Sequence, residues 1–413
     1  MAPMLAPLRE RNYRLWAAAD LVSTGGTWMQ VLGLNWVVLS VTGSAATMGF
    51  TVMAQALPVL LLGGWGGALA DRLPARPLLI ACQVIRALLA LALVFDTGRL
   101  WPIYLVAVLS GVISAVEGPS LGRFGSALVS REALGSALAL GSVLSSAGRI
   151  GGMALGGVLV GLTGPAPLFV INAASYLAVI GALAIMRPGS MRTLAEAPAS
   201  DRGVRAGLRY VLGQPVVLIV LAMSFVLGSL GRNYQVTMAA MTAGPLHGGP
   251  GAYGVLSTVF AVGAVAGGLL LAGTGRATLP ALVGAGLVIS VLQLFSGLAP
   301  NVLGFAALIL PIAAGAVILD TIVSTRVQLD TREDMRGRVL AALGMTSSLS
   351  GIVGAPLVGW LCDTEGPRGA LVLAGVVTTA AAAAGGIALI RVTGRRTQPV
   401  AAALGRTLIE QPA

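Results

Sequence analysis

Twelve separate stretches of mostly apolar residues run through this chain of 413 residues. Each has roughly twenty residues or more, the length a helix needs to cross the hydrocarbon core of a membrane. Only 10% of the residues are charged, where a soluble domain carries about 25%. We predict an all-α integral membrane protein with twelve transmembrane helices, including a first at Tyr13–Leu39, a seventh at Gln214–Met241 and a last at Gly369–Ile390.

The residue inventory excludes several classes of function. All 26 basic residues are arginine, so the chain lacks the lysine that a Walker A loop or a pyridoxal Schiff base requires. His247 is the one histidine, and Cys82 and Cys362 lie in separate apolar segments. That spacing suits neither a metal site nor a redox pair. We therefore expect no metal, no cofactor and no catalytic residue.

The net charge of +11 comes from arginines in the breaks between apolar runs. They form no stripe on a soluble domain, so we expect no nucleic-acid partner. With the N-terminus inside, the loops on the other face hold only Arg99 and Arg368. Because cytoplasmic loops carry the basic excess, both termini are predicted to be cytoplasmic.

The two halves of the chain repeat each other. "GRIGGMALGGVLVGLTGP" at 148–165 resembles "SGIVGAPLVGWLCDTEGP" at 350–367. The offset that pairs Gly151 with Gly354 also places Glu117 on Asp320. A repeat of six-helix halves is typical of a transporter whose substrate site lies between the halves. The predicted divisions are a first bundle at 1–187, a cytoplasmic linker at 188–212, a second bundle at 213–391 and a cytoplasmic tail at 392–413.

Two motifs carry a resemblance to a known family. "GALADRLPAR" at 67–76 and "GRIGGMALGG" at 148–157 resemble the loop motif and the helix 5 motif of the major facilitator superfamily. The likeness extends from about Arg9 to Ile390 and points to the exporter branch that includes enterobactin exporters and macrolide efflux proteins. It implies two pseudosymmetric six-helix bundles, a monomer in the bacterial cytoplasmic membrane, and a small-molecule substrate.

The resemblance implies a cytoplasmic gate at the first motif. Asp71 would dock on the positive N-terminal end of the eleventh helix, near Gly337, when the cytoplasmic side is shut. Arg72 and Arg76 would reach neighbouring acids, for which the chain offers Glu132, Glu333 and Asp334. A tight loop that only orients the helices is the alternative. The predicted gate residues are Gly67, Asp71, Arg72 and Arg76.

The second motif places glycines at every fourth position of the fifth helix, leaving a smooth stripe for a neighbouring helix. The resemblance implies that this stripe limits leak, whereas close packing alone is the alternative. Met153 replaces the customary proline of the motif. Its predicted residues are Gly148, Arg149, Gly152, Gly156 and Gly157.

Six ionisable residues fall inside the apolar stretches, where an unpaired charge costs several kcal/mol. A carboxyl group in such a site can take up a proton near neutral pH, as coupling requires. Asp20 ranks first because it lies well inside its predicted helix and departs from relatives, which often carry glutamine there and an acid at the position of Thr27. The proton-coupling candidates are Asp20, Glu117 and Asp320, and the predicted charge partners are Arg86, Arg149 and Arg232. Mutual neutralisation of all six is the alternative.

Further polar and aromatic residues on cavity-type helices are candidate cavity lining, with ordinary helix-to-helix hydrogen bonding as the alternative. They are Gln30, Asn35, Trp36, Asn233, Tyr234 and Gln235. The leading hypothesis is an antiporter driven by the proton gradient that exports a drug, siderophore or secondary metabolite, as in multidrug resistance. An importer or facilitator is the first alternative, and a membrane receptor or enzyme the second. The sequence leaves open whether the substrate is a cation or an anion.

Overall fold

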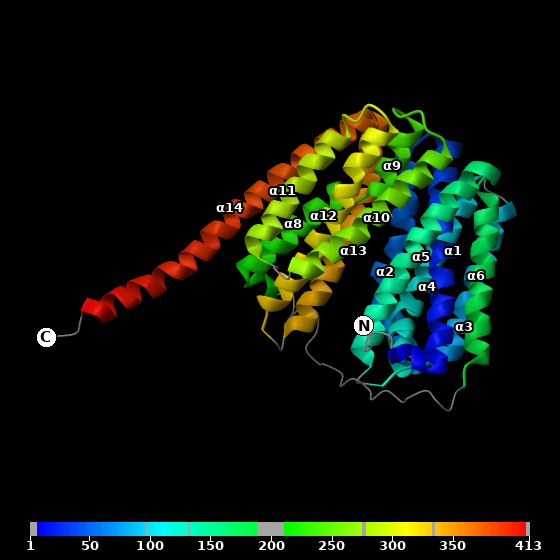
Figure 1. The fold of residues 1–413 in the computed structure, drawn as a ribbon, viewed down its shortest axis with the longest axis horizontal. Coiled ribbons are helices and arrows are strands. Elements are labelled where there is room, and N and C mark those ends of the chain that lie inside the picture. The colour runs from blue at the N-terminus through cyan, green and yellow to red at the C-terminus, as the bar shows by residue number, and fades with distance from the viewer. Residues whose placement is uncertain are drawn as a thin grey trace.

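The computed structural model describes residues 6–95, 98–130, 133–187, 210–274, 278–332 and 335–409. Every regular element within those ranges is a helix (Figure 1). The elements are η1 (Ala6–Arg9), α1 (Arg11–Thr42), α2 (Ala45–Arg72), α3 (Ala75–Phe95), α4 (Leu100–Ala127), α5 (Leu134–Thr163), α6 (Ala166–Ile185), α8 (Pro215–Gly231), α9 (Tyr234–Ala243), α10 (Pro250–Thr274), α11 (Leu279–Ser296), α12 (Val302–Leu329), α13 (Arg336–Thr364) and α14 (Gly366–Ile409).

The helices form two bundles that follow each other along the chain (Figure 1). In the first half, α1 packs on α5 and α6, α2 on α4, and α3 on α4 and α6. In the second half, α10 packs on α12, α11 on α12 and α14, and α8 on α13 and α14. The predicted fold class is therefore confirmed. Most of the predicted linker at 188–212 lies outside the described residues.

Eleven helices among the described residues are long and apolar enough to cross a membrane, with α8 and α9 forming one crossing. The twelfth crossing is α1, whose 32 residues include too many polar side chains for that criterion. Two of its polar residues, Asn12 and Asn35, are buried. Many large apolar side chains are exposed on the outer surface, including Leu61, Leu303 and Ile390. Such a shell suits contact with lipid.

The predicted span at Gln214–Met241 corresponds to one crossing from Pro215 to Ala243, but the chain breaks within it, between α8 and α9. Asn233 lies in the break, and its Nδ2 donates to the carbonyl oxygen of Ser229 at 2.7 Å. This bond satisfies a carbonyl that the end of α8 leaves without a helical partner. A helix can therefore stop inside the membrane without an exposed polar backbone.

The two halves meet through glycines on two crossed helix pairs. Where α5 crosses α10, a Cβ on Gly157 would lie 2.3 Å from the Cα of Gly254. Where α13 crosses α2, a Cβ on Gly359 would lie 2.3 Å from the carbonyl oxygen of Ala45. Only residues without a side chain allow the backbones to approach this closely.

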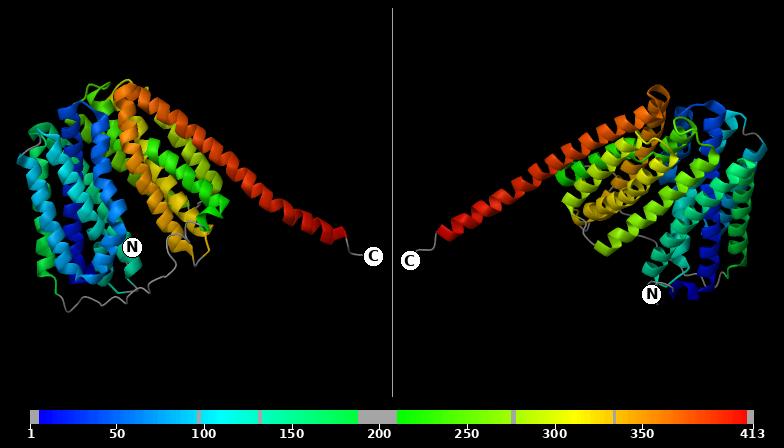
Figure 2. Two further views of the ribbon diagram at one scale, coloured as in Figure 1. Left: turned by 180° about the vertical axis from the view of Figure 1, so that it is seen from behind. Right: turned by 45° about the horizontal axis from the view of Figure 1, so that its top comes forward.

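These crossings lie at one end of the molecule. We call the end where α6 stops and α8 starts the linker end, and the opposite end the far end. The ribbons of the two halves converge at the far end and diverge toward the linker end (Figures 1 and 2). Finally, α14 continues to Ile409 and so runs through most of the segment predicted as a tail at 392–413.

Candidate functional site

A cavity of about 260 Å³ lies between the two halves, near the middle of the helices. Both halves line it, and the described lining contains two arginines and no acid. The break between α8 and α9 contributes Asn233, Tyr234 and Gln235, three of the six residues predicted as cavity lining. The full lining is Trp28, Val52, Arg149, Met153, Arg232, Asn233, Tyr234, Gln235, Val236, Met238 and Phe260.

The other three predicted lining residues lie outside this cavity. Asn35 donates from Nδ2 to Oε1 of Gln235 at 3.4 Å, which joins the two halves. Trp36 stacks on Tyr253 with ring centroids 6.1 Å apart, which joins α1 to α10. Gln30 instead accepts from Nδ2 of Asn172 at 2.6 Å, inside the first half. Asn35 and Trp36 therefore help to hold the halves together at the far end.

Four of the six intramembrane charges form two ion pairs. Arg86 on α3 lies 2.6 Å from a carboxylate oxygen of Glu117 on α4. Gln83 donates to the other oxygen at 2.7 Å, and Glu117 is buried. In the second half, Arg232 pairs with Asp320. Asp320 matches Glu117 in the repeat, but its partner comes from the break after α8 and not from the matching helix.

Arg149 corrects a sequence prediction. It was expected to be a charge partner, yet no acid in the described part of the chain pairs with it. Its guanidinium lies 5.8 Å from the ring centroid of Trp28, a distance at which a cation is attracted to the face of an aromatic ring. Its Nε is buried without an acceptor. The central cavity therefore contains an uncompensated positive charge.

A second cavity, of about 290 Å³, lies inside the first half and contains Asp20. Glu117 and Arg86 line it as a pair, whereas Asp20 has no hydrogen bond or ion pair with any described residue. Trp28 lines both cavities and so separates Asp20 from Arg149. The lining is Trp16, Asp20, Ser23, Thr24, Thr27, Trp28, Gln83, Arg86, Glu117, Leu121, Ser145, Tyr176 and Val179.

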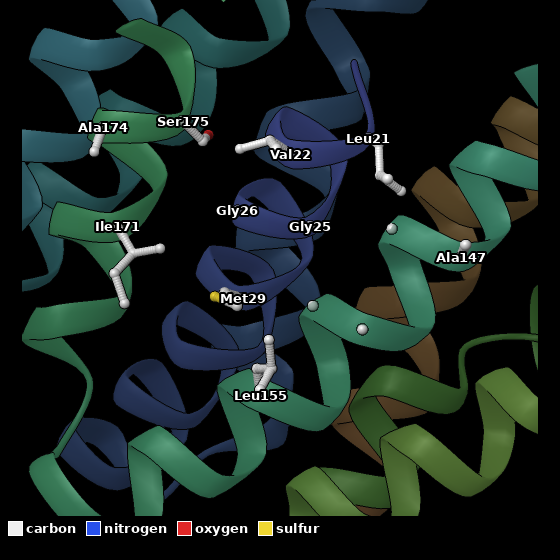
Figure 3. A pocket seen from close by; sticks show the side chains of 13 residues that line it. Leu21, Val22, Gly25, Gly26, Met29, Ala147, Leu155, Ile171, Ala174 and Ser175 are labelled. Atoms are coloured by element: carbon white, nitrogen blue, oxygen red, sulfur yellow. The ribbon is translucent and has the colours of Figure 1, made fainter. Parts of the chain in front are cut away.

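The glycine motif of α5 faces two different neighbours. A Cβ on Gly152 would lie 2.3 Å from the carbonyl oxygen of Gly25, and Gly148 and Gly156 also face α1. Gly157 faces α10 across the junction between the halves. Beside this packing, α1, α5 and α6 border an apolar groove of about 470 Å³ (Figure 3). No charged side chain lines it, and exposed Val22 and Leu155 at its edge suit contact with lipid.

The docking of Asp71 on α13 is predicted for a shut cytoplasmic side; here the halves diverge at the linker end, and the contacts described for Asp71 lie within its own half. Its carboxylate pairs with Arg123 of its own half at 2.8 Å, and its side chain is 70% exposed. Arg76 donates to the carbonyl oxygen of Ala184 at 2.9 Å. The halves diverge at this end, which explains why Asp71 binds within its own half. Arg72 is exposed and Gly67 borders open space; Glu132, Glu333 and Asp334 lie outside the described residues.

The second half lacks an equivalent pair. Arg326 occupies the repeat position of Arg123, but the second copy of the loop motif has no acid. Arg326 instead pairs with Asp330 of its own helix at 2.7 Å.

Sequence reasoning missed Asp363, which joins the halves at the far end. From the end of α13, its carboxylate accepts from Oγ of Ser44 at 2.6 Å and from the backbone amides of Ala45 at 2.8 Å and Ala46 at 3.1 Å. These groups form the first turn of α2, whose positive end favours a carboxylate. It is the contact expected of Asp71, formed at the opposite ends of the same two helices. The signal in the sequence was a helix-capping serine in "VTGSA" at 41–45.

We expect Asp363→Asn to open the far end. Losing a carboxylate at an exposed helix N-terminus removes about 0.3 to 1 kcal/mol, which changes the ratio of closed to open molecules about two- to five-fold. Spin labels on cysteines replacing the exposed residues Trp101 and Leu303, at the far ends of α4 and α12, would report longer distances. Glu365→Gln is the matched control, because this acid forms no hydrogen bond with α2 in the described structure. We call the contact between Asp363 and the first turn of α2 the Asp363 latch. An unchanged distance distribution in Asp363→Asn would show that this latch does not hold the far end closed.

Two helical bundles with a lipid-facing shell and a charged cavity between them define a membrane transporter of the major facilitator type. The family of transmembrane secretion effectors matches residues 2–407, and the chain belongs to this family of major facilitator transporters. The family is one of transporters and not of enzymes.

Relatives and solved structures agree with this assignment. The chain is 25% identical over 390 residues to the multidrug efflux pump Tap of Mycolicibacterium fortuitum, covering 84% of this chain and 88% of that protein. It is 24% identical over 251 residues to the staphyloferrin A transporter of Staphylococcus aureus, covering 60% and 63%. Over 206 residues it is 26% identical to an uncharacterised MFS-type transporter of Bacillus subtilis, covering 49% of each protein, so the chain matches about half the length of that relative.

Two solved structures share the fold. The TM-score is 0.74 with a bacterial homologue of the human lysosomal transporter Spinster in an inward-facing, unoccupied conformation, at 16% identity over 92% of this chain and 97% of that one. It is 0.71 with an inward-facing bacterial homologue of the iron transporter ferroportin, at 17% identity over 92% and 98%. At these identities the likeness establishes the fold alone.

Proposed function

We propose that this protein exports a small amphipathic compound from the bacterial cytoplasm, in exchange for protons, by alternating access. The observation that carries the coupling is the position of Asp20. Of the three acids inside the membrane, Glu117 and Asp320 each have an arginine at ion-pair distance, whereas Asp20 has none among the described residues. An uncompensated acid in a polar, membrane-embedded cavity is suited to reversible protonation.

The position of Asp20 on α1 supports this role. Asp20 and Thr27 are seven residues apart, which is about two helical turns, and both line the cavity of the first half. The acid that relatives often carry at the position of Thr27 is therefore replaced by an acid on the same face of the same helix. The cavity can therefore keep a proton-binding acid even though that acid occupies a different position along α1.

Alternating access is supported by the unequal ends of the molecule. The far end is held by glycine crossings, by Trp36 stacked on Tyr253 and by the Asp363 latch. The arginine distribution places the linker end in the cytoplasm. On that orientation the structure is an inward-facing state, and Asp71 would dock on α13 in the opposite, outward-facing state.

The direction of transport is supported by the relationship to a multidrug efflux pump, and a siderophore as substrate by the relationship to a staphyloferrin A transporter. Import or facilitated diffusion on the same fold is the competing function. We expect inverted membrane vesicles containing the protein to accumulate one member of a panel of toxic compounds and siderophores when acidified inside, and to stop when a protonophore is added. Accumulation that the protonophore does not affect would refute coupling, and uptake only into right-side-out vesicles would refute export.

A further inference from the structure

We infer that the central cavity selects an anionic aromatic substrate, whose acidic group binds Arg149 and Tyr234 and whose ring lies among Trp28, Tyr234 and Phe260. The inference rests on the proposed function, because it names the class of substrate for the same cavity. It goes further by fixing the sign of the substrate's charge, which the sequence left open.

The charge balance of the cavity favours an anion. Arg149 and Arg232 line it, and no acid does. Asp320 compensates Arg232 from outside the lining, but no acid among the described residues pairs with Arg149, whose guanidinium only faces the Trp28 ring. A positive charge held in a low-dielectric site is costly until an opposite charge arrives. A bound carboxylate would supply that charge, whereas a cationic substrate would add to the repulsion.

Two buried polar atoms point to the same ligand group. Nε of Arg149 and Oη of Tyr234 are both buried without a hydrogen-bond partner, and both residues line this cavity. Each can donate a hydrogen bond, and a carboxylate offers only acceptors. Buried polar groups are rarely left unpaired unless a ligand or water completes them. A carboxylate has two acceptor oxygens, so an acidic group bound in this cavity offers one to each donor.

The start of α9 adds a third source of positive potential. α9 is ten residues long and begins at Tyr234 without a side-chain cap, because the amide of Asn233 donates back to α8. An uncapped helix N-terminus attracts anions. Half-helices that start inside the membrane present their N-termini to anionic substrate groups in other transporters. Here the residues around this terminus, from Arg232 to Val236, line the cavity.

The walls of the cavity suit an aromatic ring. Tyr234 and Phe260 pack with ring centroids 4.8 Å apart, and Trp28 lies beside Arg149 on the opposite half. Aromatic faces favour offset or edge contacts with a further ring. At about 260 Å³, the cavity lies near the lower limit of small-molecule sites, which is about 300 Å³. A two-ring aromatic acid is therefore a suitable probe.

The test compares three probes that share one ring system and differ in charge: naphthoate, naphthamide and naphthylmethylammonium. Binding to the purified full-length protein in lipid nanodiscs is measured by equilibrium dialysis at neutral pH. Because charge-assisted hydrogen bonds are roughly twice as strong as neutral ones, we expect naphthoate to bind about ten-fold or more tightly than naphthamide. The ammonium compound should bind most weakly. Equal or tighter binding of the ammonium compound would overturn the inference.

Variants of single residues test which side chains cause the preference for an anion. Arg149→Gln should remove the preference for naphthoate over naphthamide, whereas Arg149→Lys should keep part of it by retaining the charge. Tyr234→Phe should weaken naphthoate binding several-fold. Tyr104→Phe should not, because its hydroxyl bonds the carbonyl oxygen of Thr47 away from the cavity. A preference that survives Arg149→Gln in protein with an unchanged size-exclusion profile would contradict the assignment.

Binding at equilibrium requires no proton gradient, so the two proposals fail separately. Selective naphthoate binding without proton-driven transport would contradict the proposed function and uphold the anion site. Proton-driven transport by a protein that prefers the ammonium probe would uphold the proposed function and contradict the anion site.

Discussion

Replacing Asp20 by asparagine should abolish proton-driven accumulation of substrate and leave the protein folded and able to exchange substrate down its own gradient. Asparagine has nearly the same shape as aspartate but cannot gain or lose a proton. Asp20 forms no ion pair or hydrogen bond with the described residues, so its neutralisation breaks no contact. Thermal stability should therefore stay the same or rise. The measurement is uptake into inverted vesicles with and without a pH gradient, beside substrate exchange at equal pH.

The size of the expected loss follows from the driving force. Moving one charge through about 100 mV supplies about 2.3 kcal/mol, which sustains a roughly fifty-fold substrate gradient. Without a proton carrier, the substrate concentrations inside and outside the vesicles should become equal. Glu10→Gln is the control, because Glu10 is an exposed acid at the start of the same helix and its side chain caps no backbone amide. Undiminished accumulation by Asp20→Asn would place the proton carrier elsewhere.

The sequence predicts the number of crossings and the two halves because both depend on local patterns, namely the length of apolar runs and a repeat. The break at Asn233 could not be predicted in this way. The surrounding segment is as apolar as a continuous span, and the break depends partly on contact with a distant helix. A Cβ on Gly354 of α13 would lie 2.1 Å from the carbonyl oxygen of Ser229, the same carbonyl that Asn233 binds.

The pairing of intramembrane charges depends on side-chain geometry, which the sequence does not contain. Six charged residues on different helices allow many pairings, and the repeat relates Glu117 to Asp320 without relating their partners. The structure pairs four of the six and so isolates Asp20 and Arg149 in adjacent cavities. The distinction between charges that stabilise the bundle and charges free to act emerges only from those distances.

The Asp363 latch shows a different limit on what the sequence can predict. The loop motif indicates a contact for Asp71 at the linker end, and the structure forms the analogous contact for Asp363 at the far end. A transporter sequence must encode contacts for more than one conformation, and no single structure forms them all. The helix-capping signal at Ser44 was visible, but its acidic partner lies 319 residues away and has no motif of its own.

Glu117→Gln should destabilise the protein, whereas Asp20→Asn should not, although both acids line the same cavity. Glu117→Gln leaves Arg86 buried without a counter-charge, and breaking a buried pair from one side costs about 3–5 kcal/mol. We expect a large fall in the melting temperature, which fluorescence-detected size-exclusion chromatography after heating would measure. Removing both charges in Arg86→Gln/Glu117→Gln should recover most of the loss, because no unpaired ion is left.

The double variant also separates structure from coupling. If Asp20 carries the proton and the Arg86–Glu117 pair only stabilises the bundle, the recovered double variant should still accumulate substrate when a pH gradient is applied. A stable double variant that exchanges substrate but ignores the gradient would make Glu117 the carrier instead. A single Glu117→Gln variant as stable as the parent would show that Arg86 does not need its partner, and that the pair does not hold α3 against α4.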